Sequence, residues 1–183
     1  NYNPEATNDN GSCEYHSCQQ ISLPGGWFTL SSYILAENMD AEFIMSSLGS
    51  NLYILKNNIG SVYLPEYNFN GIGDLDFHYG YQIKTLSVDT LRICGTQMLP
   101  EESPIFMDAG WNFIAYLREN PASIDLALEN LISDYNLSIA KDYNGNVFLP
   151  EFSFNGIGDL VAGQGYQVKL NNSDTLEYLS NEF

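Results

Sequence analysis

The sequence predicts an α+β protein built from two tandem repeats, each a small, mostly antiparallel β-sheet with one short helix in the order β-α-β-β-β-β. Two observations predict this fold. Residues 64–75 return as residues 149–160, and residues 80–84 return as residues 165–169, in both cases 85 positions later. A period of this length is the signature of a repeated structural unit. With 183 residues and 44% hydrophobic content, the chain can bury one shared core or two small ones.

The repeat also sets the expected boundaries along the chain. Gly26-Trp27 returns as Gly110-Trp111 at a shift of 84, so one residue is inserted before the later motifs. Prolines and acidic residues between the two copies are typical of a linker. The expected segments are an Asx-rich leader at residues 1–20, a first module at residues 21–97, a linker at residues 98–107 and a second module at residues 108–183. The sequence leaves open whether the two modules share one core.

Each module is expected to open with a strand that is followed by a short helix. Aromatic and β-branched residues after Trp27 are typical of a strand that leaves a turn. Asn38 is the expected N-cap before a helical pattern with a buried stripe of Ala41, Ile44, Met45 and Leu48. In the second module Asn120 is the expected N-cap and Pro121 the first helical residue, where its missing N–H does no harm. The matching buried stripe consists of Ile124, Leu128, Leu131 and Ile132.

A hairpin follows in each module, at residues 52–64 and 137–149. In the second copy Asn144-Gly145 separates two apolar runs, which is a strong hairpin signal. Pro65 or Pro150 ends the second strand of the hairpin, because proline cannot donate to the ladder.

The next segment repeats the pattern Phe-Asn-Gly-Ile-Gly-Asp-Leu as a compact loop. Its glycines are expected to supply unusual backbone angles, and valine at Gly71 or Gly156 should unfold the module if these two residues hold positive φ. The apolar residues expected to point inward are Ile72, Leu75, Ile157 and Leu160. The last strands are expected at residues 80–84 and 90–93, and again at residues 165–169 and 175–179.

The chain is strongly acidic, with 6 Lys and Arg against 23 Asp and Glu and a formal net charge of −17. Such a surface repels nucleic-acid phosphates and anionic lipid headgroups, which argues against both as partners. No apolar run has the length of a membrane span, so membrane insertion is not expected. We expect a mature protein or a part of a longer chain, with a surface glycan or another protein as the possible partner.

The leader and the cysteines allow several kinds of site. Cys13 and Cys18 either close a small disulfide loop in an oxidising compartment, or stay free or pair elsewhere. Cys94 aligns with Leu179 and is interpreted as a small buried hydrophobe. No cofactor is required, but the turn-rich leader offers oxygen ligands for Ca²⁺, with an Asx-rich turn without metal as the alternative. The candidate calcium ligands are Asn8, Asp9, Asn10 and Glu14.

Both parts of the chain resemble known sequence families. The leader resembles the short Asn-Tyr-Asn-Pro-x-Ala-Thr-x-Asp-Asp-Gly-Ser-Cys repeats of very large secreted and surface proteins of Bacteroidetes, with Asn10 in place of the second Asp. From Ile21 to Leu179 the chain is similar to tandem modules with the pattern Gly-Trp…Asn-Gly-Ile-Gly-Asp-Leu…Gly-Tyr-Gln-x-Lys. These occur in proteins that look like cargo of the Bacteroidetes type IX secretion system. The resemblance implies a secreted or cell-surface location and no particular reaction.

No pattern in the sequence predicts an enzyme. His16 and His78 lie outside the repeated motifs, so neither is a recurring base beside a nucleophile. The acids Glu66 and Asp74 recur in the second copy, but acids in such turns are more typical of caps and Asx-turns than of a glycosidase pair.

Binding is the more serious hypothesis. The candidate ligand-binding residues are aromatic and polar members of the repeated motifs, namely Tyr67, Asn70, Asp74, Tyr81, Phe152, Asn155, Asp159 and Tyr166. The polar members form either a shallow site or the network that holds the glycine loop in place. Trp27 and Trp111 are expected in the core, because a small domain needs large side chains to bury enough area.

The expected function is therefore that of a non-catalytic tandem module of a secreted or cell-surface protein, in adhesion, display or spacing. The alternative is a carbohydrate-binding module attached to an enzyme elsewhere in the parent chain. Exposed, coplanar aromatic side chains favour the sugar-binding alternative, and buried ones favour the structural role.

Overall fold

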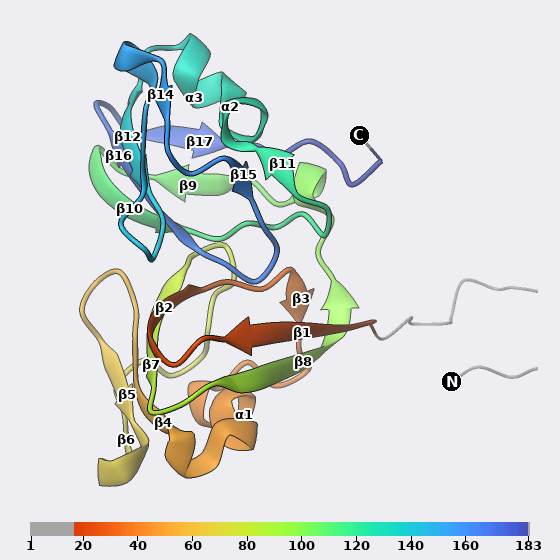
Figure 1. The fold of residues 1–183 in the computed structure, drawn as a ribbon. Helices are drawn as coiled ribbons and strands as arrows, with labels where there is room; N and C mark the ends of the chain where they lie inside the picture. Colours follow the sequence, from red (N-terminus) through yellow and green to blue (C-terminus); the bar gives the residue numbers. More distant parts are fainter. Residues whose placement is uncertain (1–16, 183) are drawn as a thin grey trace, which may run out of the picture.

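A five-stranded antiparallel sheet forms the framework of each half of the molecule (Figure 1). The computed structural model describes residues 17–182; we call residues 17–97 the first half and residues 98–182 the second half. The first sheet has the order β2 (Gly26–Leu30), β7 (Tyr81–Thr85), β4 (Leu52–Lys56), β5 (Val62–Leu64) and β6 (Phe69–Asn70). The second has the order β10 (Gly110–Ile114), β16 (Tyr166–Leu170), β12 (Leu137–Lys141), β13 (Val147–Leu149) and β14 (Phe154–Asn155). The protein is thus mostly antiparallel β-sheet with a few short helices.

The predicted hairpins are confirmed, β4 with β5 and β12 with β13. Each second strand ends at the predicted proline, where a short 3₁₀ turn begins, η2 (Pro65–Tyr67) or η4 (Pro150–Phe152). The pairing of β4 with β7 shifts register at Tyr53, and the pairing of β12 with β16 shifts at Ser138. A bulge at this position turns an extra side chain toward the outer face of the sheet.

Short helices pack against the core, and their predicted stripes are buried. In the first half α1 (Ala41–Met45) continues as the 3₁₀ helix η1 (Ser46–Asn51), and the second half has α2 (Ile124–Ala127) and α3 (Glu129–Ser133). The stripe residues Ala41, Ile44, Met45, Leu48, Ile124, Leu128 and Leu131 are buried, and Ile132 packs partly buried against them. The helical segments therefore bury the faces that the periodicity of the apolar residues predicts.

The predicted first residues of the helices are wrong in both halves. In α1 the cap is Asp40 rather than Asn38, because the Asp40 carboxylate accepts hydrogen bonds from two N–H groups of the first turn. In the second half Asn120 and Pro121 precede a short strand, β11 (Ala122–Ser123), which pairs with β15 (Asp159–Leu160). The cap is therefore Ser123, whose hydroxyl accepts from the N–H of Leu126.

Two further strand pairs lie beside the main sheets. β1 (Ser17–Leu23) pairs with β8 (Asp89–Gln97), which also pairs with β3 (Ile34–Leu35). β9 (Ile105–Met107) pairs with β17 (Asp174–Leu176), and the 3₁₀ turn η3 (Pro100–Glu102) precedes it. β1 starts inside the segment expected as leader, and β9 lies inside the expected linker. Backbone pairing thus extends into both segments, which sequence composition had marked as irregular.

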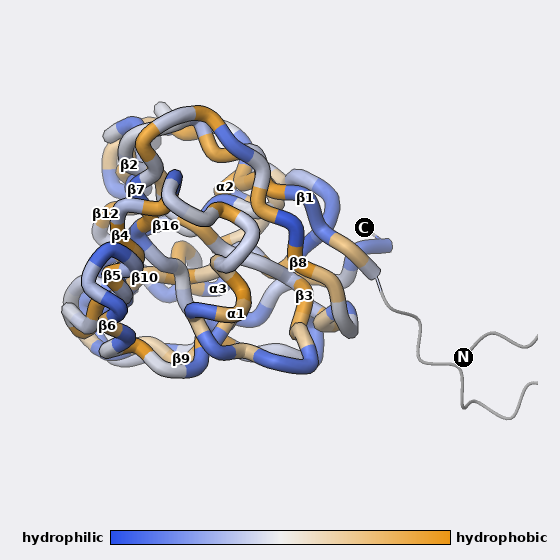
Figure 2. Tube along the Cα trace, turned by 90° about the horizontal axis from the view of Figure 1, so that it is seen from below, coloured by the Kyte–Doolittle hydropathy of each residue, from blue (hydrophilic) through white to orange (hydrophobic). Residues whose placement is uncertain are grey.

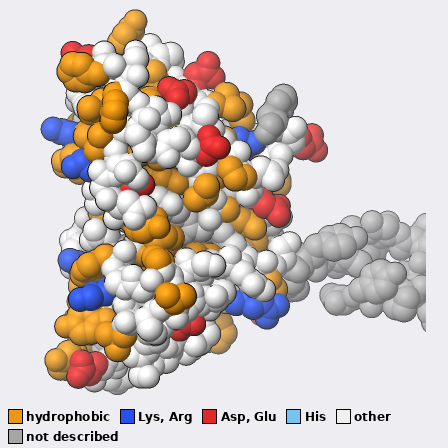
Figure 3. All heavy atoms as spheres, in the orientation of Figure 1, with side chains coloured by type: hydrophobic (Ala, Val, Ile, Leu, Met, Phe, Trp, Pro, Cys, Tyr) orange, Lys and Arg blue, Asp and Glu red, His pale blue; other side chains and the backbone are white. Residues whose placement is uncertain are grey.

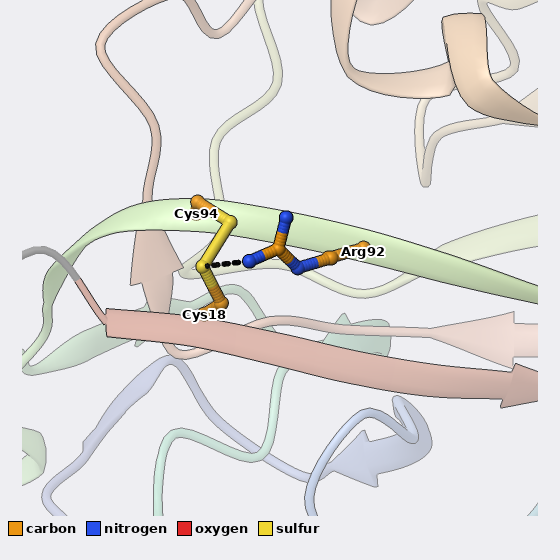
Figure 4. Close-up of a disulfide and its surroundings, with 3 residues drawn as sticks. All are labelled: Cys18, Arg92 and Cys94. Atoms are coloured by element: carbon orange, nitrogen blue, oxygen red, sulfur yellow. Dashed lines mark hydrogen bonds between the residues drawn. A yellow bond between two sulfur atoms is a disulfide. The ribbon is translucent and has the colours of Figure 1, made fainter.

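A disulfide joins Cys18 on β1 to Cys94 on β8 (Figure 4). The two residues are direct partners in the antiparallel register. The predicted Cys13–Cys18 pairing is therefore wrong, and Cys94 is a partly buried disulfide partner rather than a buried hydrophobe. The Arg92 guanidinium donates a hydrogen bond of 3.0 Å to the Cys18 sulfur.

The two halves meet through reciprocal backbone contacts. The N–H of Gly165 donates to the carbonyl of Thr29 (2.9 Å), and the N–H of Gly80 donates to the carbonyl of Phe113 (3.3 Å). Gly80 corresponds to Gly165 in the repeat, and Thr29 corresponds to Phe113. Each half therefore contributes one glycine segment and one strand segment to the interface. The glycine segment of each half contacts the strand segment of the other half. This is the arrangement of a two-fold, self-complementary interface within one chain.

A second pair of backbone contacts has the same symmetry. The N–H of Ser31 donates to the carbonyl of Gly163 (3.0 Å), and the N–H of Ala115 donates to the carbonyl of His78 (3.3 Å). Side chains add bonds on one side only, such as the Thr29 hydroxyl to the carbonyl of Gly165 (2.6 Å). The backbone exchange is therefore symmetric, while the side chains differ.

The buried hydrophobic residues of both halves form one continuous core. Phe28 and Tyr143 pack edge to face across the halves, with ring centroids 4.7 Å apart. Figure 2 shows hydrophobic segments along the interior strands and hydrophilic segments in turns at the periphery. The two halves thus share a core, which answers the question that the sequence left open.

Candidate functional site

Two of the candidate ligand-binding residues, Tyr81 and Tyr166, are buried in the protein. Their hydroxyl groups accept hydrogen bonds from the backbone N–H of Asp76 (2.7 Å) and of Val161 (2.9 Å). Burial raises the pKa of Tyr81 to about 12, and burial also raises the pKa of Tyr166. Both side chains hold the loop before them, so neither is placed to contact a ligand.

Asn70 and Asn155 hold the glycine loops. The Asn70 side-chain oxygen accepts from the N–H groups of Ile72 (3.1 Å) and Gly73 (2.9 Å), and its amide donates to Asp40 (3.0 Å). Asn155 makes the corresponding bonds in the second half, with Asp125 in the place of Asp40. Of the two alternatives for the polar set, the structure therefore shows these two residues in the loop-holding network.

The glycines of the loops behave differently from the prediction. Positive φ occurs at Gly73 (φ 73°) and Gly158 (φ 80°), and not at Gly71 or Gly156. The inward positions are as predicted, because Leu75 and Leu160 are buried and the two isoleucines pack partly buried against the core. The second glycine of each loop is thus the one that needs a left-handed backbone.

The remaining four candidates are exposed. Tyr67 and Phe152, in the turns η2 and η4, are 72% and 70% exposed, and Asp74 and Asp159 are exposed beside the loops. Four of the eight candidate residues are therefore buried or hold the loops, and the other four are exposed. Asn8, Asp9, Asn10, Cys13, Glu14 and His16 lie outside the described residues.

The expectation that Trp27 and Trp111 belong to the core is wrong. They are 48% and 51% exposed and lie on the outer faces of the two five-stranded sheets. On β2 the neighbouring Phe28 and Leu30 are buried, and strand alternation turns Trp27 to the opposite face. Tryptophan is large enough to stay half exposed while its inner edge still covers the sheet.

Two lysines surround the first tryptophan. Lys84 is the cross-strand partner of Trp27, and its Nζ lies 5.8 Å from the Trp27 ring centroid and 4.9 Å from that of Tyr53. The Nζ of Lys56 lies 5.7 Å from the Trp27 ring centroid. These are cation–π distances. We call Trp27, Tyr53, Lys56 and Lys84 the first Trp–Lys face.

The second half carries a corresponding surface. The Nζ of Lys141 lies 4.9 Å from the Trp111 ring centroid, and Lys169 is the cross-strand partner of Trp111. Ser138 occupies the position of Tyr53, so this surface has one aromatic ring fewer. We call Trp111, Lys141 and Lys169 the second Trp–Lys face. Figure 3 shows basic side chains beside hydrophobic ones along the left edge of both halves.

The two faces contain all four lysines of the chain. Within residues 17–182 none of these lysines forms an ion pair with a carboxylate. This is unexpected at a net charge of −17, because an ammonium group on such a surface normally has many carboxylates near it. The positive charge of both faces is therefore available to a ligand.

A hollow borders the first Trp–Lys face, and the second half has a hollow lined by corresponding residues. In the first half it has a volume of about 580 Å³ and is lined by Tyr53, Pro65 and Glu66 among others. In the second half a hollow of about 540 Å³ is lined by the corresponding residues Ser138, Pro150 and Glu151. Tyr53 belongs to both the first face and its hollow, so the two form one continuous surface.

The part of the chain that the structure describes contains no group of three or more His, Cys, Asp and Glu side chains placed to bind a metal ion. His78 lies 2.7 Å from Asp76 through its Nδ1 atom, on the surface. No helix among residues 17–182 is long and apolar enough to cross a membrane.

The signal that identifies the Trp–Lys faces was present in the sequence. Lys56 and Lys84 recur as Lys141 and Lys169, and these positions account for every lysine of the chain. Strand alternation then places Trp27 on the same side as Lys84, because the two residues are cross-strand partners. The pairing itself follows only from the sheet order. No family model matches this chain, and no curated protein or solved structure was found that is similar to it.

Proposed function

We propose that this chain is a non-catalytic tandem module of a secreted or cell-surface protein, and that it binds a glycan on its Trp–Lys faces. The single observation that carries the proposal is the half exposure of Trp27 and Trp111 on the outer sheet faces, each beside lysine side chains. An exposed indole ring offers a flat apolar platform for a sugar ring, and the ammonium groups beside it can donate hydrogen bonds to sugar oxygens.

The arrangement of the chain supports a role in attachment. Both ends of the described chain lie on the right in Figure 1, whereas the strands that carry the faces, β2, β4 and β7 with β10, β12 and β16, lie along the left edge. Figure 3 shows basic and hydrophobic side chains along that edge. A ligand on that edge is therefore not hindered by either end of the described chain. We infer from the repeated motifs and the equal sheet orders that the two halves are copies of one unit, so the module has two sites of one kind.

A secreted location is part of the same proposal. The Cys18–Cys94 disulfide supports it, because disulfides persist in oxidising compartments. The resemblance to modules of type IX secretion cargo supports it independently. Adhesion is then the role that uses both features, and attachment to an enzyme elsewhere in a parent chain would use the same sites.

The test is a glycan array followed by pull-down on insoluble polysaccharides, with the wild type and with Trp27→Ala, Trp111→Ala and the double variant. We expect binding by the wild type, weaker binding by each single variant and none by the double variant. Phe43→Ala and Phe106→Ala are matched controls, because these rings are 56% and 68% exposed and lie off the faces. A wild type that binds no glycan, or a double variant that binds like the controls, would overturn the proposal.

A further inference from the structure

We infer that the glycan is acidic, with carboxylate or sulfate groups held by Lys56 and Lys84 on the first Trp–Lys face and by Lys141 and Lys169 on the second. The inference rests on the proposed function and specifies the ligand class of the same sites. It starts from the distribution of positive charge, which the proposal of a sugar platform does not by itself explain.

The basic residues of the chain divide into two groups. Arg92 is exposed on β8 and donates a hydrogen bond to the Cys18 sulfur, so its charge lies apart from the Trp–Lys faces, and Arg118 is only 1% exposed. The lysines all lie on the Trp–Lys faces. A neutral sugar needs donors and acceptors of many kinds, such as hydroxyl and amide groups. A concentration of ammonium groups, without carboxylate partners, instead matches an anion.

The first face places two like charges around one ring. The Nζ atoms of Lys56 and Lys84 lie 5.7 Å and 5.8 Å from the same Trp27 ring centroid. Both ammonium groups therefore contribute positive potential around the same indole ring, where each attracts an anion. An anionic group bound to these ammonium groups keeps its sugar ring beside the indole. The geometry therefore favours a sugar ring that carries its own negative charge.

The net charge of −17 does not prevent such binding. At physiological ionic strength the Debye length is about 8 Å, so distant carboxylates are largely screened while the lysines at the contact are not. The repulsion of the whole protein then acts as a filter, because it disfavours polyanions that cannot also stack on the aromatic rings.

The two faces differ in a way that predicts their relative strength. Lys84 lies 4.9 Å from the Tyr53 ring centroid, so the first face offers two rings around one ammonium group. Ser138 replaces this tyrosine on the second face, where Lys141 contacts Trp111 alone. We expect the first face to bind the acidic glycan more tightly.

The experiment compares polygalacturonate with its methyl ester, which has the same backbone without the charge, and adds a sulfated polysaccharide with its desulfated form. Binding of the full chain is measured by calorimetry in about 0.15 M salt. We expect binding to the charged member of at least one pair and on the order of tenfold weaker binding to its neutral counterpart, the effect of one charge-assisted hydrogen bond. The pair that responds distinguishes carboxylate from sulfate recognition.

Lysine variants then test which residues bind the charged groups of the polysaccharide. Lys84→Gln should weaken binding of the charged polysaccharide on the order of tenfold, whereas Lys84→Arg keeps the charge and should restore most of it. Lys141→Gln should have a smaller effect, because the second face is expected to be weaker. Thermal unfolding of each variant shows that the fold is kept.

The outcomes separate this inference from the proposed function. Equal binding to charged and neutral members, or to a neutral polysaccharide only, would keep the glycan-binding function and overturn the acidic class. No binding to any polysaccharide would overturn both. Self-association in light scattering that Lys84→Gln abolishes would overturn the inference and assign the faces to the acidic surface of a second copy.

Discussion

Gly80 and Gly165 meet across the interface between the two halves, and a side chain on either residue would collide with the other half. A Cβ atom on Gly80 would lie 2.9 Å from the carbonyl oxygen of Ile114, and one on Gly165 would lie 3.2 Å from the Cα atom of Gly80. Neither glycine has a positive φ. The close approach of the two halves therefore explains why both copies of the motif have glycine here.

The first prediction concerns these two glycines. Gly80→Ala and Gly165→Ala should each lower the free energy of unfolding by about 1–3 kcal/mol, because the added methyl group pushes the backbones of the halves apart. Denaturant unfolding gives the value. Ser22→Ala, at an exposed position of β1, is the control and should stay within about 0.5 kcal/mol of the wild type. Wild-type stability of both glycine variants would contradict the close approach.

The second prediction concerns the disulfide between β1 and β8. A Cys18→Ser and Cys94→Ser double variant should lose about 2–4 kcal/mol, because the bond closes a loop between residues 76 positions apart. Mass spectrometry of an unreduced digest should find the two cysteine peptides linked. Cys13→Ser is the control and should keep the wild-type stability. If Cys18 were bonded to Cys13 instead, this variant would be destabilised.

The third prediction concerns the loop-holding asparagines. Asn70→Ala and Asn155→Ala should each cost roughly 1–2 kcal/mol, because each removes two hydrogen bonds from loop N–H groups and one to a helix-capping or first-turn carboxylate. Asn58→Ala, at an exposed turn position, provides the comparison. Hydrogen exchange at Gly73 and Gly158 should accelerate in the respective variants. Unchanged exchange there would show that the asparagines do not hold the loops.

The fourth prediction concerns alkaline pH. Burial raises the pKa of Tyr81 and of Tyr116 to about 12, from an ordinary value of 10. A raised pKa in the folded state means that the stabilising contribution is complete below pH 10 and is lost as the pH rises from 10 to 12. The free energy of unfolding should therefore fall across this window. Tyr81→Phe should be less stable at neutral pH and should show a shallower fall, and an equally steep fall would exclude Tyr81 as a cause.

Local patterns predicted much of the fold. The hairpins follow from apolar runs around a turn and a terminating proline, and the buried helix stripes follow from spacings of three and four residues. The N-cap residues were predicted wrongly, because a different nearby side chain accepts the hydrogen bonds of the first helical turn. Asp40 is closer to the first turn than Asn38. In the second half Ala122 pairs with a neighbouring strand, so the helix cannot begin before it. Such outcomes depend on tertiary neighbours, which no local pattern contains.

The candidate site was predicted less well, for a related reason. Asn70 and Tyr81 recur in both copies, but recurrence does not distinguish a loop-holding residue from a ligand contact. Trp27 was expected in the core on account of its size, whereas its face is decided by the alternation that buries Phe28 and Leu30. The lysines of the faces recur as well, and their isolation from carboxylates became visible only once the strands were paired.

The sequence by itself determined the hairpins and the buried stripes, because each depends on residues close together in the chain, and it also determined the recurring motifs and the acidic charge. The tertiary structure alone decided the Cys18–Cys94 bond, the exposure of Trp27 and the reciprocal contact of Gly80 with Gly165. These features join residues far apart in the chain, and they depend on which surfaces fit together when the two halves close a common core.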